Sequence, residues 1–227
     1  MVIIKIDILS LFPDFFNGIL NESIIKRAID KKLVEINIIN FRDYSPLPNK
    51  QVDDTPYGGG AGMLIRCEPI FLALDKIKTK DSHVILLSPE GVTYKQSVAS
   101  RLKEYKHLII ICGHYEGFDE RIKTLVDEII SIGDYILTGG EIAAMAIVDS
   151  VVRLIPGVIN EESLVSESFN NNLLDYPQYT KPAEYRGLKV PDVLLSGNHQ
   201  KIREYRALEQ IKKTKDLRPD LMGDKDE

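Results

Sequence analysis

The sequence has few cysteines, no long hydrophobic run and no overall excess of positive charge. Its two cysteines, Cys67 and Cys112, lie far apart and form no Cys-x-x-Cys motif. This excludes a dense disulfide framework or a zinc ribbon and is typical of a reducing cytosol. No run of about 18 uncharged apolar residues occurs, so no membrane span is expected. The apolar N-terminus is interrupted by Lys5 and Asp7, and we interpret it as a strand rather than a signal peptide.

Two nucleotide-binding fingerprints are also missing. The chain has neither the Gly-x-Gly-x-x-Gly of dinucleotide-binding proteins nor the Gly-x-x-x-x-Gly-Lys-Ser/Thr of the P-loop. A nicotinamide enzyme is therefore the weakest interpretation. The glycine-rich stretch 57–62 has the composition of a phosphate cradle, but no lysine follows it.

Composition indicates a folded globular protein. The 227 residues are 44% hydrophobic and 28% charged, which fits one large domain or one domain with a small second module. The net charge is −5, but it is uneven: residues 181–218 hold ten Lys/Arg against five Asp/Glu. The remainder is thus about ten charges negative. A basic segment on an acidic body suggests a nucleic-acid contact, although a solvated helix face explains the charge equally well.

Hydrophobic periodicity predicts alternating strands and helices. We expect strands at 2–9, 33–39, 83–87, 107–112 and 128–132, and helices at 14–32, 68–77, 94–105, 118–126, 141–152 and 196–215. This alternation indicates a mainly parallel α/β sheet. Composition changes near residue 160, so we expect a first domain over 1–160, a connector over 161–175 and a small helical domain over 176–227.

Glycine-rich or proline-rich loops follow three of the expected strands, at 88–91, 113–117 and 133–140. Ligands of open α/β sheets bind beyond the carboxyl ends of the strands, and glycine permits close approach of the backbone. Each loop alone is more simply a tight turn. Together they predict a pocket built largely from main chain, suited to a small polar cofactor.

Seven segments, in order along nearly the whole chain, resemble the bacterial tRNA (guanine-N1)-methyltransferases that act at tRNA position 37. These segments are PYGGGAGM (56–63), LLSPEG (86–91), CGHYEGFDERI (112–122), SIGDYILTGGE (131–141), VVRLIPGV (151–158), LLDYPQYTKP (173–182) and VPDVLLSGNHQKIREYR (190–206). The family belongs to the SPOUT class, so the resemblance implies a deep trefoil knot in the sheet, which pattern reasoning does not propose.

The resemblance implies that S-adenosylmethionine lies among the glycine-rich loops. The residues expected to bind it are Leu87, Ser88, Pro89, Gly113, Tyr115, Gly117, Ile132, Gly133, Asp134, Tyr135, Ile136, Leu137, Gly139 and Gly140. For Asp134, a structural role in a turn is as plausible as a ligand role. The resemblance also implies assistance by magnesium, for which the sequence identifies no ligand set, and no metal site is predicted.

The same resemblance assigns catalytic and substrate roles. Glu167 would be the base that removes the N1 proton of guanine, at a position where the family most often has aspartate, and Arg153 the cationic partner. Substrate binding is expected of Glu116, Tyr57, Gly58, Gly59, Asp175, Lys201, Arg203 and Arg206. Without the resemblance, Glu167 reads as a solvated linker residue and Arg153 as a charge at a helix C-terminus.

The family works as a homodimer with a shared active site, so a cytoplasmic homodimer acting on tRNA with guanine 3′ of the anticodon is expected. Two alternatives stay open. One is a SPOUT methyltransferase of another RNA. The other is a non-catalytic RNA-binding or cofactor-sensing module, which the glutamate at position 167 motivates.

Overall fold

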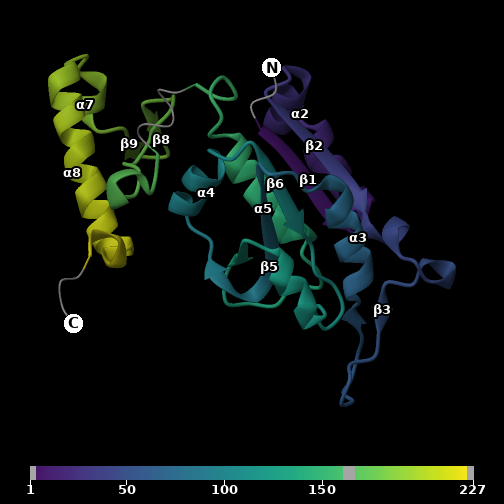
Figure 1. Cartoon of the computed structure of the whole chain (residues 1–227). Helices are drawn as coiled ribbons and strands as arrows, with labels where there is room; N and C mark the ends of the chain where they lie inside the picture. Colours follow the sequence, from purple (N-terminus) through teal and green to yellow (C-terminus); the bar gives the residue numbers. More distant parts are fainter. Residues whose placement is uncertain (1–3, 161–166, 224–227) are drawn as a thin grey trace. The chain divides into compact units, whose positions relative to one another are not determined.

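The computed structural model describes residues 4–160 and 167–223. The chain divides into two compact units, Met1–Ile159 and Asn160–Glu227. In Figure 1 the first unit is a sheet with helices packed on it, and the second consists of helices and a short hairpin. Residues 161–166 of the expected connector lie outside the described residues. No described helix is long and apolar enough to cross a membrane.

Five parallel strands form the sheet of the first unit, in the order β2-β1-β6-β5-β7. Their bounds are β1 (Ile4–Ser10), β2 (Val34–Asn40), β5 (Ser82–Thr93), β6 (His107–Ile111) and β7 (Glu128–Ser131). In β6, Leu108 and Ile110 enter one core cluster, whereas Ile109 and Ile111 enter the other. Burial on both faces explains the apolar strands and confirms the expected parallel α/β sheet.

Helices cover the two faces of this sheet. One core cluster takes side chains from η1 (Pro13–Phe16), α1 (Asn17–Asn21), α2 (Ser23–Asp30), α4 (Gln96–Leu102) and α5 (Glu141–Val152). The other takes them from η2 (Phe41–Tyr44), α3 (Cys67–Ile77) and η4 (Glu120–Leu125). A short 3₁₀ turn, η3 (Pro48–Lys50), and a hairpin of β3 (Asp53–Asp54) and β4 (Leu64–Ile65) extend from this body.

The expected helix 14–32 is wrong in one respect: it is divided into η1, α1 and α2. Ser23 has a φ of 51°, which turns the chain between α1 and α2. Phe15 is 54% exposed, whereas the next residue, Phe16, is buried. The segment begins as a tighter 3₁₀ helix, which shifts the inward-facing position. Residues 120–125 within the expected helix 118–126 are likewise 3₁₀.

Strand β5 is longer than expected. It continues beyond the predicted end at residue 87 to Thr93, and its pairing with β7 shifts register between Leu87 and Val92. The expected loop 88–91 is therefore an irregularity within a strand. It brings the backbone of Ser88 and Pro89 to the edge of the cavity described below.

The second unit has little core of its own. It contains η5 (Asn170–Asn172), β8 (Glu184–Tyr185), β9 (Leu188–Lys189), α7 (Asp192–Leu195), α8 (His199–Leu217) and η6 (Pro219–Met222). The side chain of Asn198 accepts a hydrogen bond from the Lys201 amide and caps α8. Among its described residues only Thr214 is buried, and Leu208 and Ile211 of α8 are exposed. The trefoil knot stays a prediction of the resemblance.

A glycine-rich cavity as the candidate active site

A cavity of about 300 Å³ lies beyond the carboxyl ends of β6 and β7 and beside the irregular middle of β5. Four stretches of chain supply its wall: 87–89, 113–118, 130–133 and 135–140, with Ala143 of α5 beneath them. This is the place where parallel α/β sheets bind ligands. Residues from all three segments singled out in the sequence therefore meet around one space.

Close backbone packing at Gly140 holds this cavity together. The Gly140 amide donates a 2.8 Å hydrogen bond to the Gly113 carbonyl. A Cβ at position 140 would stand 2.8 Å from both the Cys112 Cα and the Gly113 nitrogen. Only glycine fits there without displacing main chain, so the loop before α5 can lie directly on the end of β6.

Nearly all residues expected to bind the cofactor line this cavity. They are Leu87, Ser88, Pro89, Gly113, Tyr115, Gly117, Ile132, Gly133, Tyr135, Ile136, Leu137, Gly139 and Gly140. Glu116, expected to bind substrate, lines it as well. Asp134 is exposed and is not part of the wall, so its ligand role stays a prediction.

Sequence reasoning missed six residues of the wall. They are His114, Phe118, Ile130, Ser131, Thr138 and Ala143. His114 and Thr138 lie inside the glycine-rich segments quoted above, so their positions in the sequence could have identified them as residues of the cavity wall. Ile130 and Ala143 belong to apolar runs of β7 and α5, which look like ordinary core in the sequence.

Buried polar groups lie behind the cavity. Ser10 at the end of β1 donates a 2.7 Å hydrogen bond from its hydroxyl to Oε1 of Glu141, and both side chains are buried. The Nδ1 atom of His114 is buried without a hydrogen-bond partner. Burial, reinforced by the charge of Glu141, raises the pKa of the Cys112 thiol well above its ordinary value. Cys112 is thus a neutral packing residue and no candidate nucleophile.

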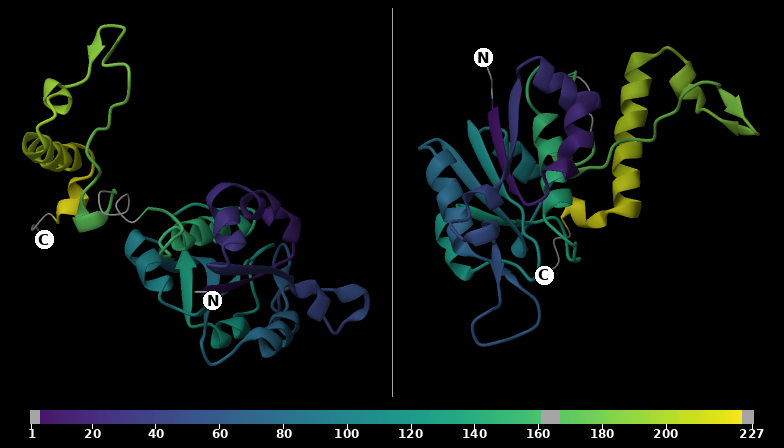
Figure 2. Two further views of the ribbon diagram at one scale, coloured as in Figure 1. Left: turned by 90° about the horizontal axis from the view of Figure 1, so that it is seen from above. Right: turned by 90° about the vertical axis from the view of Figure 1, so that its right-hand side faces the viewer.

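A projecting loop, residues 55–63, connects β3 and β4; we call it the glycine arm. Figures 1 and 2 show it extending from the body of the first unit. Its glycines at 58, 59, 60 and 62 have positive φ, and Tyr57 is fully exposed. The expected substrate residues Tyr57, Gly58 and Gly59 therefore lie together on an exposed loop.

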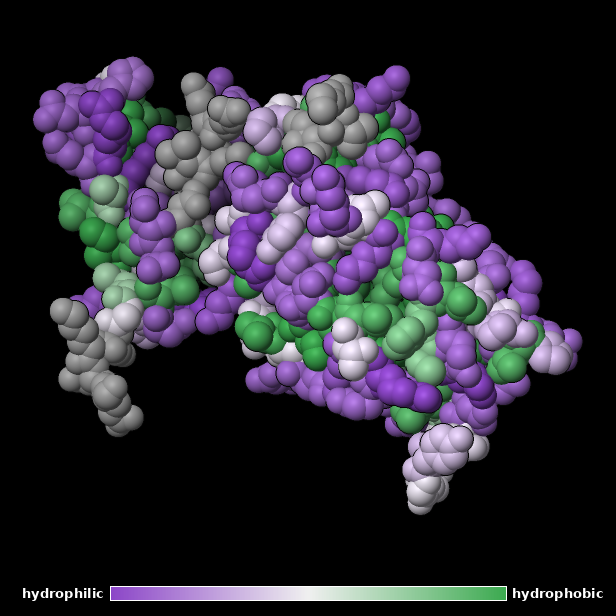
Figure 3. All heavy atoms as spheres, in the orientation of Figure 1, coloured by the Kyte–Doolittle hydropathy of each residue, from purple (hydrophilic) through white to green (hydrophobic). Residues whose placement is uncertain are grey.

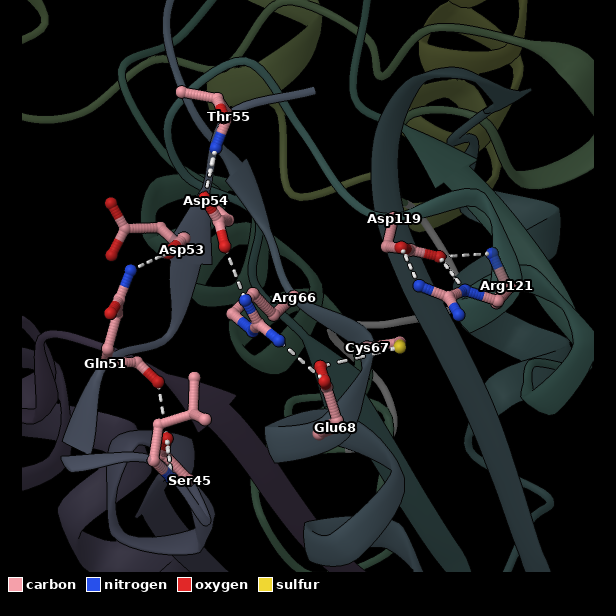
Figure 4. A network of polar contacts seen from close by, with 11 residues as sticks. Ser45, Gln51, Asp53, Asp54, Thr55, Arg66, Cys67, Glu68, Asp119 and Arg121 are labelled. Carbon is pink, nitrogen blue, oxygen red and sulfur yellow. Dashed lines mark hydrogen bonds and ion pairs between the residues drawn. The ribbon is translucent and has the colours of Figure 1, made fainter. Parts of the chain in front are cut away.

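The base of the glycine arm carries a network of ionic contacts (Figure 4). Arg66 contacts Asp54 through Nη1 at 2.5 Å and Glu68 through Nη2 at 2.7 Å. The hydrogen bond from Arg66 lowers the pKa of the Glu68 carboxyl. Nearby, Arg121 pairs with Asp119 at 2.6 Å, and this bond holds the pKa of Asp119 below its usual range. No pattern in the sequence indicates these contacts of Arg66.

The expected catalytic pair is divided between the units. Arg153 follows the last residue of α5 and is half-buried in the first unit. Glu167 is half-buried in the second unit, as is Asp175. The structure describes each of them within its own unit, and their mutual arrangement stays a prediction.

The second unit contains a groove of about 570 Å³. Its lining includes Tyr176, Tyr179, Lys181 and Arg206 but no Asp or Glu. The guanidinium of Arg206 lies 4.7 Å from the centre of the Tyr176 ring, a cation–π distance. The other expected RNA-binding cations, Lys201 and Arg203, are exposed on α8.

Among the described residues, no three His, Cys, Asp or Glu side chains gather closely enough to hold a metal ion. Assistance by magnesium therefore stays an implication of the resemblance alone.

Comparisons with known proteins identify the family. A profile described as tRNA (guanine-1)-methyltransferase TrmD matches residues 4–224. The chain is 62% identical over 217 residues to the tRNA (guanine-N(1)-)-methyltransferase of Malacoplasma penetrans, covering 96% of both. It is 53% identical over 222 residues to that of Latilactobacillus sakei, covering 96% of this chain and 90% of the relative. It is 52% identical over 219 residues to that of Mycoplasmopsis synoviae, covering 96% of both. With the match spanning nearly every described residue, the chain belongs to the tRNA (guanine-1)-methyltransferase TrmD family.

Proposed function

We propose that this protein transfers a methyl group from S-adenosylmethionine to N1 of the guanine at tRNA position 37, just 3′ of the anticodon. The products are N1-methylguanine and S-adenosylhomocysteine. The observation that carries the proposal is the cavity at the carboxyl ends of β6 and β7 and the irregularity of β5, formed by the same segments that resemble the family. The relatives' names, tRNA (guanine-N(1)-)-methyltransferase, support the substrate.

The residues of the cavity fit S-adenosylmethionine. The volume of about 300 Å³ is at the lower end of the range for small-molecule sites. The wall offers main-chain groups of 113–117, 132–133 and 135–140 for polar atoms, and apolar side chains such as Leu87 and Ile132 for the remainder. When bound, this cofactor supplies a methyl group activated by a positively charged sulfur.

The acceptor nitrogen requires help from the protein. Guanine N1 carries a proton and is a poor nucleophile until that proton leaves. Glu167 accepts the proton as general base. Arg153 stabilises the negative charge that develops on the guanine O6. Holding the guanine in line with the methyl group lowers the barrier further.

Glu116 recognises the edge of the guanine. It lines the cavity, and an ionised carboxylate accepts hydrogen bonds from adjacent donors such as the guanine N1–H and amino group. The guanine has to leave the stack of neighbouring tRNA bases to reach the cavity. The exposed glycine arm, with Tyr57, offers a stacking surface for the nucleotides around it.

The second unit holds the anticodon branch of the tRNA. Lys201, Arg203 and Arg206 contact phosphates, which sets affinity and salt dependence but not the choice of base. The acid-free groove around Tyr176 and Arg206 supports this role. The reaction takes place in the cytoplasm.

The active enzyme is a homodimer in which Glu167 of one protomer serves the cavity of the other. Large apolar side chains beside the cavity support an interface there: Phe15, Tyr135, Ile136 and Ile142 are each roughly half or more exposed. Figure 3 shows hydrophobic side chains gathered on one face of the first unit. Exposed apolar patches of this kind mark protein interfaces.

Nucleoside mass spectrometry after incubation with the methyl donor tests the proposal. The substrates are two transcripts that differ only in having guanine or adenine 3′ of the anticodon. N1-methylguanine is expected from the first transcript alone. A different modified nucleoside would identify another RNA target, and tight tRNA binding without product would identify a non-catalytic binding module.

A further inference from the structure

The strand that ends the glycine arm also forms part of the cavity's support. The Ile65 amide donates a 2.8 Å hydrogen bond to the Gly117 carbonyl, and the Ile65 carbonyl accepts one of 2.9 Å from Asp119. Two residues before Ile65, the carbonyl of Met63 accepts a 3.0 Å hydrogen bond from the Glu116 amide. Because Glu116 and Gly117 line the cavity, the return strand of the arm and the cavity wall form one hydrogen-bonded piece.

Side-chain packing reinforces this connection at Gly62. A Cβ there would stand 2.3 Å from Cγ and 2.7 Å from Oε1 of Glu116. The carboxylate of Glu116 therefore lies directly on the Gly62 backbone. Any shift of the arm at Gly62 moves the support beneath Glu116.

The arm itself has few restraints beyond its base. Within it, Cβ atoms at Gly58 and Gly59 would meet nothing within 4 Å, so these residues make no close packing. Glycine-rich chain has large conformational entropy. The position of Gly62 thus depends on how firmly the two ends of the arm are held.

Arg66 holds both ends. Its side chain contacts Asp54, the last residue before the arm, and Glu68 in the first turn of α3. Its amide donates a 2.8 Å hydrogen bond to the Val52 carbonyl. Figure 4 shows the guanidinium lying between the two carboxylates. The Arg66 side chain is 24% exposed, whereas Asp54 and Glu68 are 52% and 40% exposed. The two contacts therefore depend on the planar geometry of the guanidinium, which binds both carboxylates at once.

We propose that Arg66 is a positioning residue that fixes the glycine arm on β3 and α3, so that Gly62 supports Glu116 at the cavity and RNA binding becomes coupled to cofactor binding. The inference rests on the proposed function. Asp54 serves the same purpose as the partner of Arg66. Neither residue touches the reacting atoms.

Steady-state kinetics of Arg66→Met test this role. This variant keeps most of the side-chain volume and loses the fork. We expect the KM for tRNA to rise about tenfold while kcat stays within about twofold, because orientation of the arm affects binding rather than chemistry. Arg66→Lys should recover part of the loss, and Asp54→Asn should raise the KM similarly, with no further rise in the double variant.

Arg101→Met is the matched control. Arg101 also holds a carboxylate with both arms of its fork, at 3.1 and 2.7 Å from Glu128, but it lies on α4, far in sequence from the arm. Its KM should equal that of the wild type. Equal KM values for Arg66→Met and Arg101→Met would overturn the proposal, as would a loss confined to kcat. If Arg66→Met proves unfolded by circular dichroism, Asp54→Asn alone decides.

Calorimetric binding measurements separate this inference from the proposed function. In the wild type, S-adenosylhomocysteine should tighten tRNA binding about five- to tenfold, and in Arg66→Met this coupling should disappear while affinity for the nucleoside alone is unchanged. Coupling retained in the variant refutes the role of Arg66. A wild type that couples the two ligands yet produces no N1-methylguanine refutes the proposed function and leaves the inference standing.

Discussion

The amide of Gly140 and the carbonyl of Gly113 are joined by a 2.8 Å hydrogen bond, with no room for a side chain between the two segments. This contact packs the loop before α5 against the end of β6. Two loops that are widely separated in sequence thereby become adjacent walls of one cavity. The shape of the cavity depends on main chain meeting main chain.

Gly140→Ala should weaken binding of S-adenosylhomocysteine by at least about tenfold. The added Cβ would meet the Cys112 Cα and the Gly113 nitrogen at 2.8 Å, and relieving such overlap typically costs about 1–3 kcal/mol. Calorimetric titration measures the affinity. Gly18→Ala is the control, because a Cβ at Gly18 in α1 meets nothing within 4 Å. Unchanged affinity in Gly140→Ala would show that the cavity wall accommodates the added Cβ, and it would contradict this prediction.

Glu167→Gln should lower kcat by about 10²–10⁴-fold, the usual contribution of a general base, and should leave cofactor affinity unchanged. Glu167→Asp, which restores the commonest residue of the family, should retain most of the activity. Glu184→Gln, at an exposed position of β8, serves as control. Single-turnover methylation measures all three, and undiminished turnover in Glu167→Gln removes this residue from the mechanism.

Arg206→Ala should weaken tRNA binding and reduce the slope of log affinity against log salt by about one, the effect of one lost phosphate contact. Arg186→Ala offers a comparison, since Arg186 also stacks on a tyrosine, at 5.2 Å from the Tyr185 ring centre, but lies outside the groove. Filter binding at several salt concentrations gives both slopes. Equal effects of the two substitutions would argue against a specific role of the groove.

Asp7 links stability to acid pH. Burial alone would raise its pKa, but hydrogen bonds from His107, Lys5 and Asn37 outweigh burial and hold the pKa below its ordinary value. A depressed folded-state pKa stabilises the protein fully above the unfolded-state value of about 4, and this stabilisation is lost as pH falls through the folded-state pKa.

Asp7→Asn should therefore destabilise the protein at neutral pH by about 1–3 kcal/mol, because asparagine offers one acceptor oxygen where the carboxylate of Asp7 offers two to its three donors. It should also flatten the dependence of the unfolding free energy on pH below about pH 4. Urea unfolding between neutral pH and about pH 3 provides the measurement. Asp81→Asn, at an exposed position, should change neither quantity. An unchanged acid slope in Asp7→Asn would contradict the assignment.

Ile136→Glu should dissociate the proposed homodimer. Ile136 is 82% exposed beside the cavity, and a charge buried in an apolar interface is unfavourable. Light scattering after gel filtration should give a monomer without methyltransferase activity. Leu72→Glu changes a 41% exposed leucine of α3, a helix on the face of the sheet opposite α5, and should remain dimeric. A dimeric Ile136→Glu would place the interface elsewhere.

The sheet was predictable because its signal is local. Strands such as residues 107–111 are apolar along their whole length, and burial on both faces of a parallel sheet requires this pattern. The glycines of 113–117 and 133–140 likewise indicated a main-chain cavity before any geometry was known. The resemblance to the methyltransferase family then indicated S-adenosylmethionine as the ligand of this cavity, whereas composition alone leaves the ligand's identity open.

Other features depend on contacts distant in sequence. Phe15 and Phe16 have the same side chain, so hydrophobicity does not tell which of them is buried. The 3₁₀ helix at the start of the segment decides it. The continuation of β5 to Thr93 depends on pairing with Ser131 of β7. The ion pair between Arg66 and Asp54 likewise depends on the pairing of β3 with β4. A sequence rich in proline and glycine does not indicate that pairing.

The position of β1 between β2 and β6 has a consequence for biosynthesis. Its Asp7 meets His107, a residue 100 positions later. A nascent chain leaving the ribosome therefore keeps one edge of its first strand unpaired until β6 has been translated and has emerged. Closing so large a loop is slow. Young polypeptides of this enzyme should thus depend on chaperones during synthesis more than the mature protein does after release.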